Sequence, residues 1–269
     1  MVDLHCHVLP AIDDGSESLD QSLEFCRVAL ADGVTTLVAT PHQKPGQYEN
    51  PPQAIQLKVR ELQQALREAD VPIGIVEGAE VYCVPDIVQR VREKRVTTIG
   101  DTGRYILLEF PYQQFPLRPE ETVFQLKLGG VTPVLAHPER IAFFTGDIKR
   151  LETLVRLGCL TQITASAILG EFGEKAKDYS FRMLQRGLGH IISSDAHDAV
   201  YRPPILSRAR DAAAKLVGAD RAQAMVSEVP QAVCDGKDWE PWELPDDPPP
   251  AAAGLLERLR SLLRGKERP

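Results

Sequence analysis

The sequence predicts an α/β fold, a closed parallel barrel of about seven strand–helix units. Three observations support this prediction. Short runs rich in β-branched residues alternate with longer amphipathic patterns, which is typical of repeated βα units and a parallel sheet. A chain of 269 residues can bury one full core, and barrels of this type need roughly 200 residues or more. Residues of types that bind metals follow the apolar runs, and functional residues of parallel β/α barrels lie at the carboxyl ends of the strands.

The predicted strands are the short apolar runs. They cover residues 2–8, 36–40, 73–76, 105–108, 133–136, 160–163 and 190–192. In closed parallel β/α folds the carboxyl ends of the strands converge on one face, and that face carries the chemistry. Residues remote in sequence can therefore meet in space.

The predicted helices are the amphipathic stretches between these runs. They cover residues 18–33, 52–69, 85–94, 119–128, 148–157, 174–186 and 205–217. The first begins with a sequence that resembles a capping box at Ser18 and ends at Gly33. Its expected buried face is formed by Leu19, Leu23, Cys26 and Leu30. The chain has no internal repeat and no glycine-rich phosphate loop, so a nucleotide cofactor has no support.

Composition excludes several functional classes. The chain has 31 Lys and Arg residues against 38 Asp and Glu residues, a net charge of −7. Because phosphate backbones are bound by clustered basic residues, we expect no nucleic-acid partner. The five cysteines are odd in number, widely spaced and without a Cys-x-x-Cys pair, as expected for reduced thiols in a cytoplasmic enzyme. We also expect no signal peptide and no membrane span.

The composition changes after Cys234. We predict a catalytic barrel over residues 1–234, an acidic, proline-rich linker over 235–250 and a basic amphipathic helix over 251–269. The leucines at helical spacing are Leu255, Leu256, Leu259, Leu262 and Leu263. We favour packing of this helix on the barrel or on a second subunit of a homo-oligomer. A membrane surface or an acidic partner is the alternative, because basic residues accompany the leucines.

Nine residues close to the ends of the predicted strands form a candidate metal site. They are His5, His7, Asp14, His42, Glu80, Glu109, His137, Asp195 and His197. Alternate side chains of a strand share a face, so His5 and His7 can act as a clamp. Glu80 can bridge two cations because a carboxylate has two oxygens. In the Asp13-Asp14-Gly15 turn we choose Asp14, which is next to the glycine.

The donor types in this set predict the chemistry. Mixed imidazole and carboxylate ligation suits Mn²⁺, Fe²⁺ or Zn²⁺. Two such ions, roughly 3.5 to 4 Å apart, can bind a hydroxide nucleophile and clamp the oxygens of a displacement at phosphorus. Arg140 and Arg202 follow candidate ligands in the sequence, and a guanidinium offers planar, bidentate hydrogen bonds to phosphate. The sequence therefore predicts hydrolysis of a phosphate ester.

Taken together, these segments resemble the bacterial PHP-superfamily (polymerase and histidinol phosphatase) protein-tyrosine phosphatases of capsule and exopolysaccharide assembly. The resemblance covers roughly residues 1–234 in the right order. The matching motifs are Asp3-Leu4-His5-Cys6-His7 with Asp13-Asp14-Gly15-Ser16, Ala39-Thr40-Pro41-His42, Gly78-Ala79-Glu80-Val81-Tyr82, Leu108-Glu109-Phe110-Pro111, Val134-Leu135-Ala136-His137-Pro138-Glu139-Arg140, and Ser193-Ser194-Asp195-Ala196-His197 with Arg202-Pro203-Pro204.

The resemblance implies a distorted barrel with a manganese-preferring site of up to three ions, acting on phosphotyrosine of a capsule-type tyrosine kinase. It implies that Arg140 and Arg202 handle the phosphate. The implied ligand groups are His5, His7, Glu80 and Asp195 for one ion, Glu80, Glu109 and His137 for a second, and Asp14, His42 and His197 for a third. The chain departs from the family pattern at Thr164, where relatives usually have asparagine, and in the tail beyond Cys234.

The cysteines independently narrow the type of phosphatase. Cysteine-dependent tyrosine phosphatases require an arginine six positions after the cysteine. Those positions hold Ile12, Asp32, Gln89, Ala165 and Glu240. A thiolate nucleophile therefore has no support. A phenolate leaving group, with a pKa of about 10, needs less protonation than an alkoxide, so a site without a dedicated acid suits phosphotyrosine.

Three alternative functions remain open. The first is a small-molecule phosphatase, such as one acting on histidinol phosphate; the Gly-Ala-Glu-Val-Tyr and His-Pro-Glu-Arg segments favour the protein phosphatase instead. The second is a noncatalytic regulator that binds the kinase through its tail. The complete set of candidate metal ligands argues against this alternative. The third is a nucleic-acid-processing PHP-type nuclease, which the acidic net charge disfavours.

Overall fold

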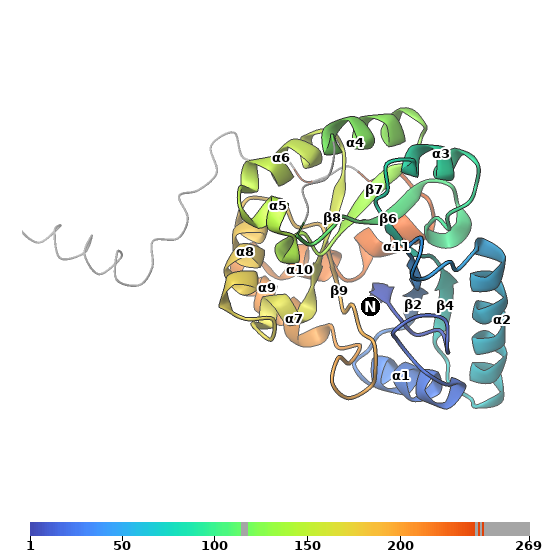
Figure 1. Ribbon diagram of the computed structural model, residues 1–269. Coiled ribbons are helices and arrows are strands. Elements are labelled where there is room, and N and C mark those ends of the chain that lie inside the picture. Colours follow the sequence, from blue (N-terminus) through green and yellow to red (C-terminus); the bar gives the residue numbers. More distant parts are fainter. Residues whose placement is uncertain (114–117, 240–241, 243, 245–269) are drawn as a thin grey trace, which may run out of the picture.

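The computed structural model describes residues 1–113, 118–239, 242 and 244 (Figure 1). The predicted helix over 251–269 and most of the predicted linker lie outside the described residues. Among the described residues, no helix combines the length and the apolar character needed to cross a bilayer.

All pairs of named strands among the described residues are parallel, and they form two sheets, one with the order β1-β2-β4 and one with the order β3-β5-β6-β7-β8-β9. The strands are β1 (Val2–Cys6), β2 (Thr36–Ala39), β3 (His42–Gln43), β4 (Gly74–Glu77), β5 (Glu80–Tyr82), β6 (Tyr105–Glu109), β7 (Thr132–Ala136), β8 (Leu160–Thr164) and β9 (Ile191–Ser193). β3 and β5 follow β2 and β4 after short breaks and pair with each other. With β3 continuing the path of β2 and β5 that of β4, the described strands occupy seven positions around the barrel.

The barrel closes between the first strand and the segment after the last. Cys6 and Ala196 form a parallel bridge. Two backbone hydrogen bonds flank it, from the His7 N–H to the Ala196 carbonyl (2.8 Å) and from the Asp195 N–H to the His5 carbonyl (2.9 Å). The closure therefore brings the first and last candidate ligands side by side.

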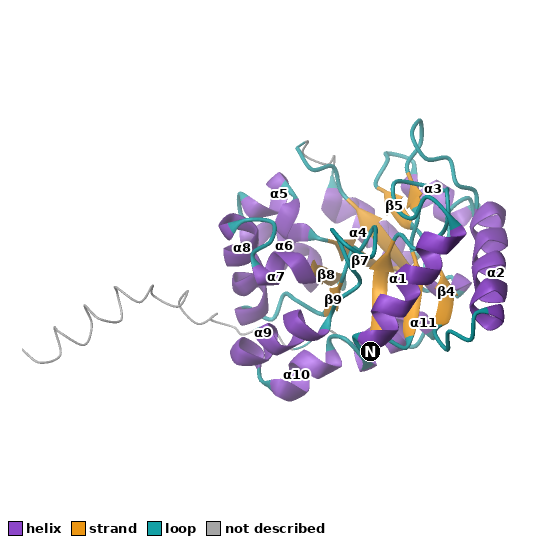
Figure 2. Ribbon diagram, turned by 90° about the horizontal axis from the view of Figure 1, so that it is seen from below, coloured by secondary structure: helices purple, strands orange, loops and turns teal. Residues whose placement is uncertain are grey.

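Helices surround the strands on the outside (Figures 1 and 2). They are α1 (Leu19–Ala31), α2 (Pro52–Glu68), α3 (Ile87–Arg92), α4 (Pro119–Leu128), α5 (Ala142–Thr145), α6 (Ile148–Arg156), α7 (Ala165–Leu169), α8 (Glu174–Gln185), α9 (Ser207–Val217), α10 (Ala219–Ala224) and α11 (Glu228–Cys234). One buried cluster joins the strands to these helices, and a second joins alternate strand residues to α11. In β6, Tyr105 and Leu107 belong to the second cluster, so Glu109 continues the inner face.

The predicted fold class, a parallel β/α barrel, is confirmed. Each strand and helix predicted within residues 1–234 has an observed counterpart; the short elements β3, β5, α5, α7, α10 and α11 were not predicted. The predicted face of α1 was wrong in part, because Leu19 is 40% exposed while Phe25 and Ala29 are buried. At its start, the Ser18 side chain accepts a hydrogen bond from the Gln21 N–H, as the predicted cap requires.

The first residues of the predicted linker contact the amino-terminal ends of the strands. The Tyr105 hydroxyl donates to the Lys237 carbonyl (2.7 Å) and accepts from the Trp239 N–H (3.2 Å). Trp242 stacks on His190, just before β9, with ring centroids 5.8 Å apart. These contacts lie at the end of the barrel opposite the candidate site.

Candidate metal centre

All nine candidate ligands converge at the carboxyl ends of the strands. His5, His42, Glu80 and Glu109 are strand residues, and the others lie in the segments that follow β1, β7 and β9. Seven of the nine line a cavity of about 250 Å³, while His5 and His7 are fully buried. The barrel topology thus assembles the set from segments spread over nearly the whole chain.

Four donor atoms form a tight cage at the buried side of this site. His5 Nε2 lies 3.3 Å from His7 Nε2, 3.5 Å from Glu80 Oε2 and 3.3 Å from Asp195 Oδ1. His7 Nε2 lies 3.6 Å from the same Glu80 oxygen and 3.5 Å from the same Asp195 oxygen. His5, His7 and Glu80 offer donor atoms that all lie within 4.8 Å of one another, and Asp195 Oδ1 lies close to both imidazoles. Imidazole nitrogen and carboxylate oxygen are donors that zinc-like cations accept. This donor set fits a divalent cation.

Two further groups of donors adjoin the cage. His7, Asp14, His42 and His197 offer donor atoms within 4.8 Å of one another, and so do His42, Glu80 and Glu109. His42 touches both groups, with Nε2 3.3 Å from Asp14 Oδ1 and Nδ1 2.9 Å from Glu80 Oε2. His137 Nε2 instead lies 2.7 Å from Glu80 Oε1. The structure therefore places Glu80 at the centre, with His42 rather than His137 grouped with Glu80 and Glu109.

Two side chains hold the imidazole rings of the cage in orientation. Asp13 Oδ2 lies 2.7 Å from His7 Nδ1, and Gln162 Oε1 lies 3.1 Å from His5 Nδ1. Each oxygen accepts a hydrogen bond from the Nδ1–H of its histidine, which leaves the Nε2 lone pair directed at the cage. Sequence reasoning missed both roles. The position of Asp13 next to Asp14 could have indicated the role of Asp13. Gln162 is 157 positions from His5, and no local sequence pattern indicates its role.

The backbone around the site adopts conformations that few residues favour. His137 has φ 33° and Asp195 has φ 51°, both in the left-handed region, where histidine and aspartate are enriched among non-glycine residues. Gly15 passes so close to β1 that an added Cβ would lie 2.1 Å from the His7 carbonyl oxygen. These turns direct side chains at strand ends back over the barrel mouth.

The two predicted arginines lie on the far side of Asp195 from the histidines. Arg140 Nη1 donates to Asp195 Oδ2 (2.6 Å), and Arg202 Nη2 donates to the same oxygen (2.8 Å). The Arg140 guanidinium also lies between two rings, 5.2 Å from the centroid of Tyr112 and 4.8 Å from that of Phe172. Both arginines line the cavity, with 25% and 32% of their side chains exposed. They can therefore reach a phosphoryl group that enters it.

Buried carboxylates dominate the electrostatics of the site. Burial opposes the charged imidazolium of His7, but Asp13 and Asp195 outweigh it and raise the His7 pKa to about 10. Burial likewise opposes charging of His42, while Asp14 and Glu80 raise its pKa to about 11. Burial and the neighbouring Glu80 raise the pKa of Glu109 to about 7. Protons and divalent cations thus compete for the same lone pairs, which is a general property of metal sites.

Sequence reasoning also missed four residues that line the cavity, Lys44, Gln47, Tyr48 and Tyr112. Tyr48 stacks on His42 with ring centroids 5.4 Å apart, and Tyr112 stacks on His137 at the same distance. Thr164 is buried at the end of β8, and its N–H donates to Glu139 (2.8 Å).

Comparisons with known proteins agree in pointing to one family. A family model described as capsular polysaccharide synthesis, CpsB/CapC, matches residues 1–235. The tyrosine-protein phosphatase YwqE of Bacillus subtilis is 36% identical over 202 residues, 75% of this chain and 79% of that protein. The tyrosine-protein phosphatase CpsB of Streptococcus pneumoniae is 31% identical over 238 residues, 87% of this chain and 98% of that protein.

A solved structure extends this similarity to three dimensions. It comes from the crystal structures of YwqE and CpsB, described as unique metal-dependent tyrosine phosphatases. The superposition has a TM-score of 0.85 at 32% identity, and it covers 91% of this chain and 100% of that chain.

Proposed function

The chain belongs to the CpsB/CapC family of capsular polysaccharide synthesis, and on that premise we propose how its site performs the reaction of a metal-dependent tyrosine-protein phosphatase. The proposed substrate is phosphotyrosine on a capsule-associated bacterial tyrosine kinase. The proposed compartment is the cytoplasm, in keeping with five free cysteines among the described residues. The observation that carries the proposal is the cage of four donor atoms beside two arginines.

The nine converging residues are the proposed ligands of two or three cations, with Mn²⁺ preferred over Fe²⁺ or Zn²⁺. His5, His7 and Glu80 form a compact donor set, Asp195 lies beside both imidazoles, and the other five would complete the neighbouring shells. Divalent cations held there would supply an acidified water as nucleophile and neutralise charge on a phosphoryl group. The buried imidazoles suit this task because Asp13 and Gln162 fix two of the rings.

The protein side chains would orient the substrate. Arg140 and Arg202 present N–H groups on one side of the cavity, so they can hold two phosphoryl oxygens and stabilise charge that accumulates during transfer. Asp195 accepts hydrogen bonds from both guanidinium groups and thereby fixes their positions. The rings of Tyr112 and Tyr48 stand at the cavity wall, where they can contact the phenyl ring of phosphotyrosine.

A substrate panel tests the proposal. Protein treated with EDTA should lose hydrolysis of p-nitrophenyl phosphate, and Mn²⁺ should restore it. With Mn²⁺ at saturation, kcat/KM should be greater for a kinase-derived phosphotyrosine peptide than for histidinol phosphate. Activity that survives chelation would refute the metal mechanism, and a large preference for histidinol phosphate would make the small-molecule phosphatase the better assignment.

A further inference from the structure

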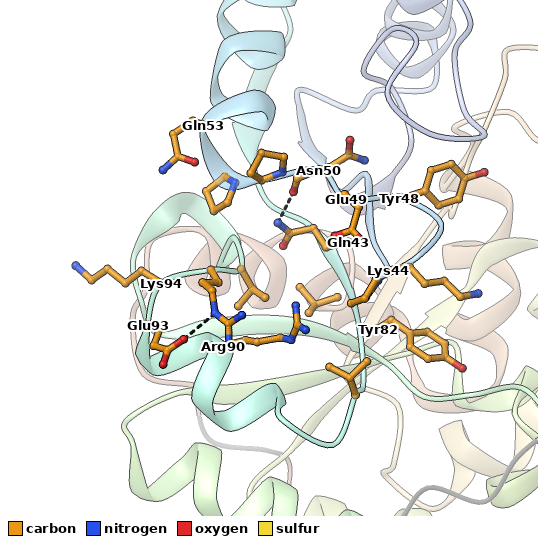
Figure 3. Close-up of a pocket in the computed structure, with 17 residues that line it drawn as sticks. Gln43, Lys44, Tyr48, Glu49, Asn50, Gln53, Tyr82, Arg90, Glu93 and Lys94 are labelled. Atoms are coloured by element: carbon orange, nitrogen blue, oxygen red, sulfur yellow. Dashed lines mark hydrogen bonds and ion pairs between the residues drawn. The ribbon is translucent and has the colours of Figure 1, made fainter.

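A second hollow adjoins the metal cavity and has no role in the reaction described so far. Figure 3 shows this groove, which has a volume of about 480 Å³ and lies over β3, β5 and the end of α3. Lys44 and Tyr48 line both the groove and the metal cavity, so the two spaces meet at these residues. The groove falls within the roughly 300–1,000 Å³ of ligand sites, whereas the metal cavity falls below that range. The metal cavity therefore has room for the phosphorylated side chain and little for its neighbours.

The groove is basic although the chain as a whole is acidic. Four basic residues line it against two acidic ones, in a chain of net charge −7. The basic residues are Lys44, Arg90, Lys94 and Arg95, and the acidic ones are Glu49 and Glu93. An excess of positive charge in a groove attracts an acidic ligand.

Two of these cations have no carboxylate partner among the described residues. Arg90 pairs with Asp86 (2.9 Å) and Arg95 with Glu93 (2.7 Å), so their charges are largely compensated. Lys94 is exposed and makes no ion pair in the described part of the chain. The Lys44 ammonium lies 4.7 Å from the centroid of the Tyr82 ring, a contact that holds the side chain without neutralising it. Figure 3 shows Lys44 at one end of the groove and Lys94 at the other.

The floor of the groove is rigid and continuous with the metal centre. The Gln43 side chain donates to the Asn50 carbonyl (2.6 Å) and accepts from the Thr97 N–H (2.8 Å). The Asn50 side chain in turn donates to the backbone carbonyl of His42 (2.9 Å). A ligand on this floor is therefore held at a fixed position relative to the candidate metal ligand His42.

We infer that this groove binds the acidic stretch of polypeptide that flanks phosphotyrosine in the protein substrate, with Lys44 and Lys94 as specificity-determining residues. The inference rests on the proposed function, because it extends the same active site. An extended segment leading away from the phosphorylated side chain passes Lys44 first and Lys94 farther along. Selectivity then comes from the charge of the flanking residues, while the metal centre acts on the phosphoryl group.

Three versions of one phosphotyrosine peptide, with acidic, uncharged or basic flanking residues, test the inference on the full chain at saturating Mn²⁺. The wild type should favour the acidic over the basic peptide in kcat/KM, and added salt should reduce this preference. Lys94→Gln should lower the preference about two- to fivefold, the range of one exposed ion pair, and Lys94→Glu by roughly the square of that factor. The matched control is Lys215→Glu, a charge reversal at an exposed lysine on α9, which should leave the preference unchanged.

The outcomes separate the inference from the proposed function. Hydrolysis of all three peptides at equal rates, or a preference that Lys94→Glu does not alter, would overturn the groove assignment and leave the phosphatase intact. Failure to hydrolyse any phosphotyrosine substrate with Mn²⁺ would overturn both. Loss of oligonucleotide binding in Lys94→Glu with an unchanged peptide preference would assign the groove to nucleic acid instead.

Discussion

Replacing Asp13 with asparagine tests whether the site depends on the orientation of its imidazoles. Asp13 is not among the nine candidate ligands, yet its Oδ2 faces His7 Nδ1 at 2.7 Å and accepts the His42 N–H at 3.0 Å, while Oδ1 accepts the Gly15 N–H at 3.0 Å. In Asp13→Asn one of these oxygens becomes an NH₂ group. If the amide keeps the bond to Gly15, its NH₂ faces both His7 Nδ1 and the His42 N–H.

The expected result is weaker metal binding. An amide donor at His7 Nδ1 favours the tautomer with the proton on Nε2, which then points into the cage and blocks its lone pair. Loss of such an orienting partner typically costs 10- to 100-fold in metal affinity, or about 1.4 to 2.7 kcal/mol. The Mn²⁺ concentration that gives half-maximal activity should rise by about that factor. Maximal activity at saturating Mn²⁺ should fall much less.

The assay is a Mn²⁺ titration of EDTA-treated, dialysed protein, followed both by p-nitrophenyl phosphate hydrolysis and by metal analysis after gel filtration. Asp198→Asn is a matched control, because Asp198 also accepts backbone N–H bonds beside the site but faces none of the imidazole nitrogens of the cage. Circular dichroism checks that each variant is folded. An unchanged Mn²⁺ affinity in folded Asp13→Asn would refute the orienting role.

Three further predictions follow from the same structure. Arg140→Ala should lower kcat by about 100-fold with metal content unchanged, and the kcat of Arg140→Lys should lie between those of the wild type and Arg140→Ala. Loss of metal in Arg140→Ala would instead assign Arg140 a structural role. Gly15→Ala should reduce metal stoichiometry, because the added Cβ would lie 2.1 Å from the His7 carbonyl oxygen, whereas Gly74→Ala, with no atom nearer than 3.6 Å, should bind metal normally. Burial and the charge of Arg221 lower the pKa of His190 to about 3, so the unfolded chain binds the proton first as pH falls below about 6.5. Urea unfolding at pH 7.5 and 5.0 should show that the wild type loses about 2 kcal/mol more than His190→Gln, and equal losses would contradict this.

The sequence was sufficient to predict the convergence of the nine residues because that convergence is a property of the topology. Once parallel strands alternate with helices, the ends of the strands share one face, and residues such as Glu80 and Glu109 must meet there. Strand periodicity also predicts which way Glu109 points, since it continues the inner face of β6. These features depend on local pattern and on a general rule of the fold.

Other parts of the site depend on contacts that no local pattern records. The partner of His5 is Gln162, on a strand far along the chain, and nothing in the sequence around either residue marks the pair. The choice between Asp13 and Asp14 depends on the path of a turn whose direction is set by the close approach of Gly15 to β1. The neighbouring groove likewise forms only when β3, β5 and α3 are in place.

Asp195 joins the two halves of the proposed chemistry. Its Oδ1 lies 3.3 Å from His5 Nε2 in the cage, and its Oδ2 accepts hydrogen bonds from Arg140 and Arg202. A single carboxylate therefore links the candidate metal ligands to the guanidinium groups that we propose bind phosphate. The left-handed backbone conformation at Asp195 turns its carboxylate over the mouth of the barrel, so this one side chain can contact both the imidazoles and the guanidinium groups. Shortening or removing this side chain should thus impair metal binding and phosphate positioning together, whereas substitution of either arginine should affect only the second.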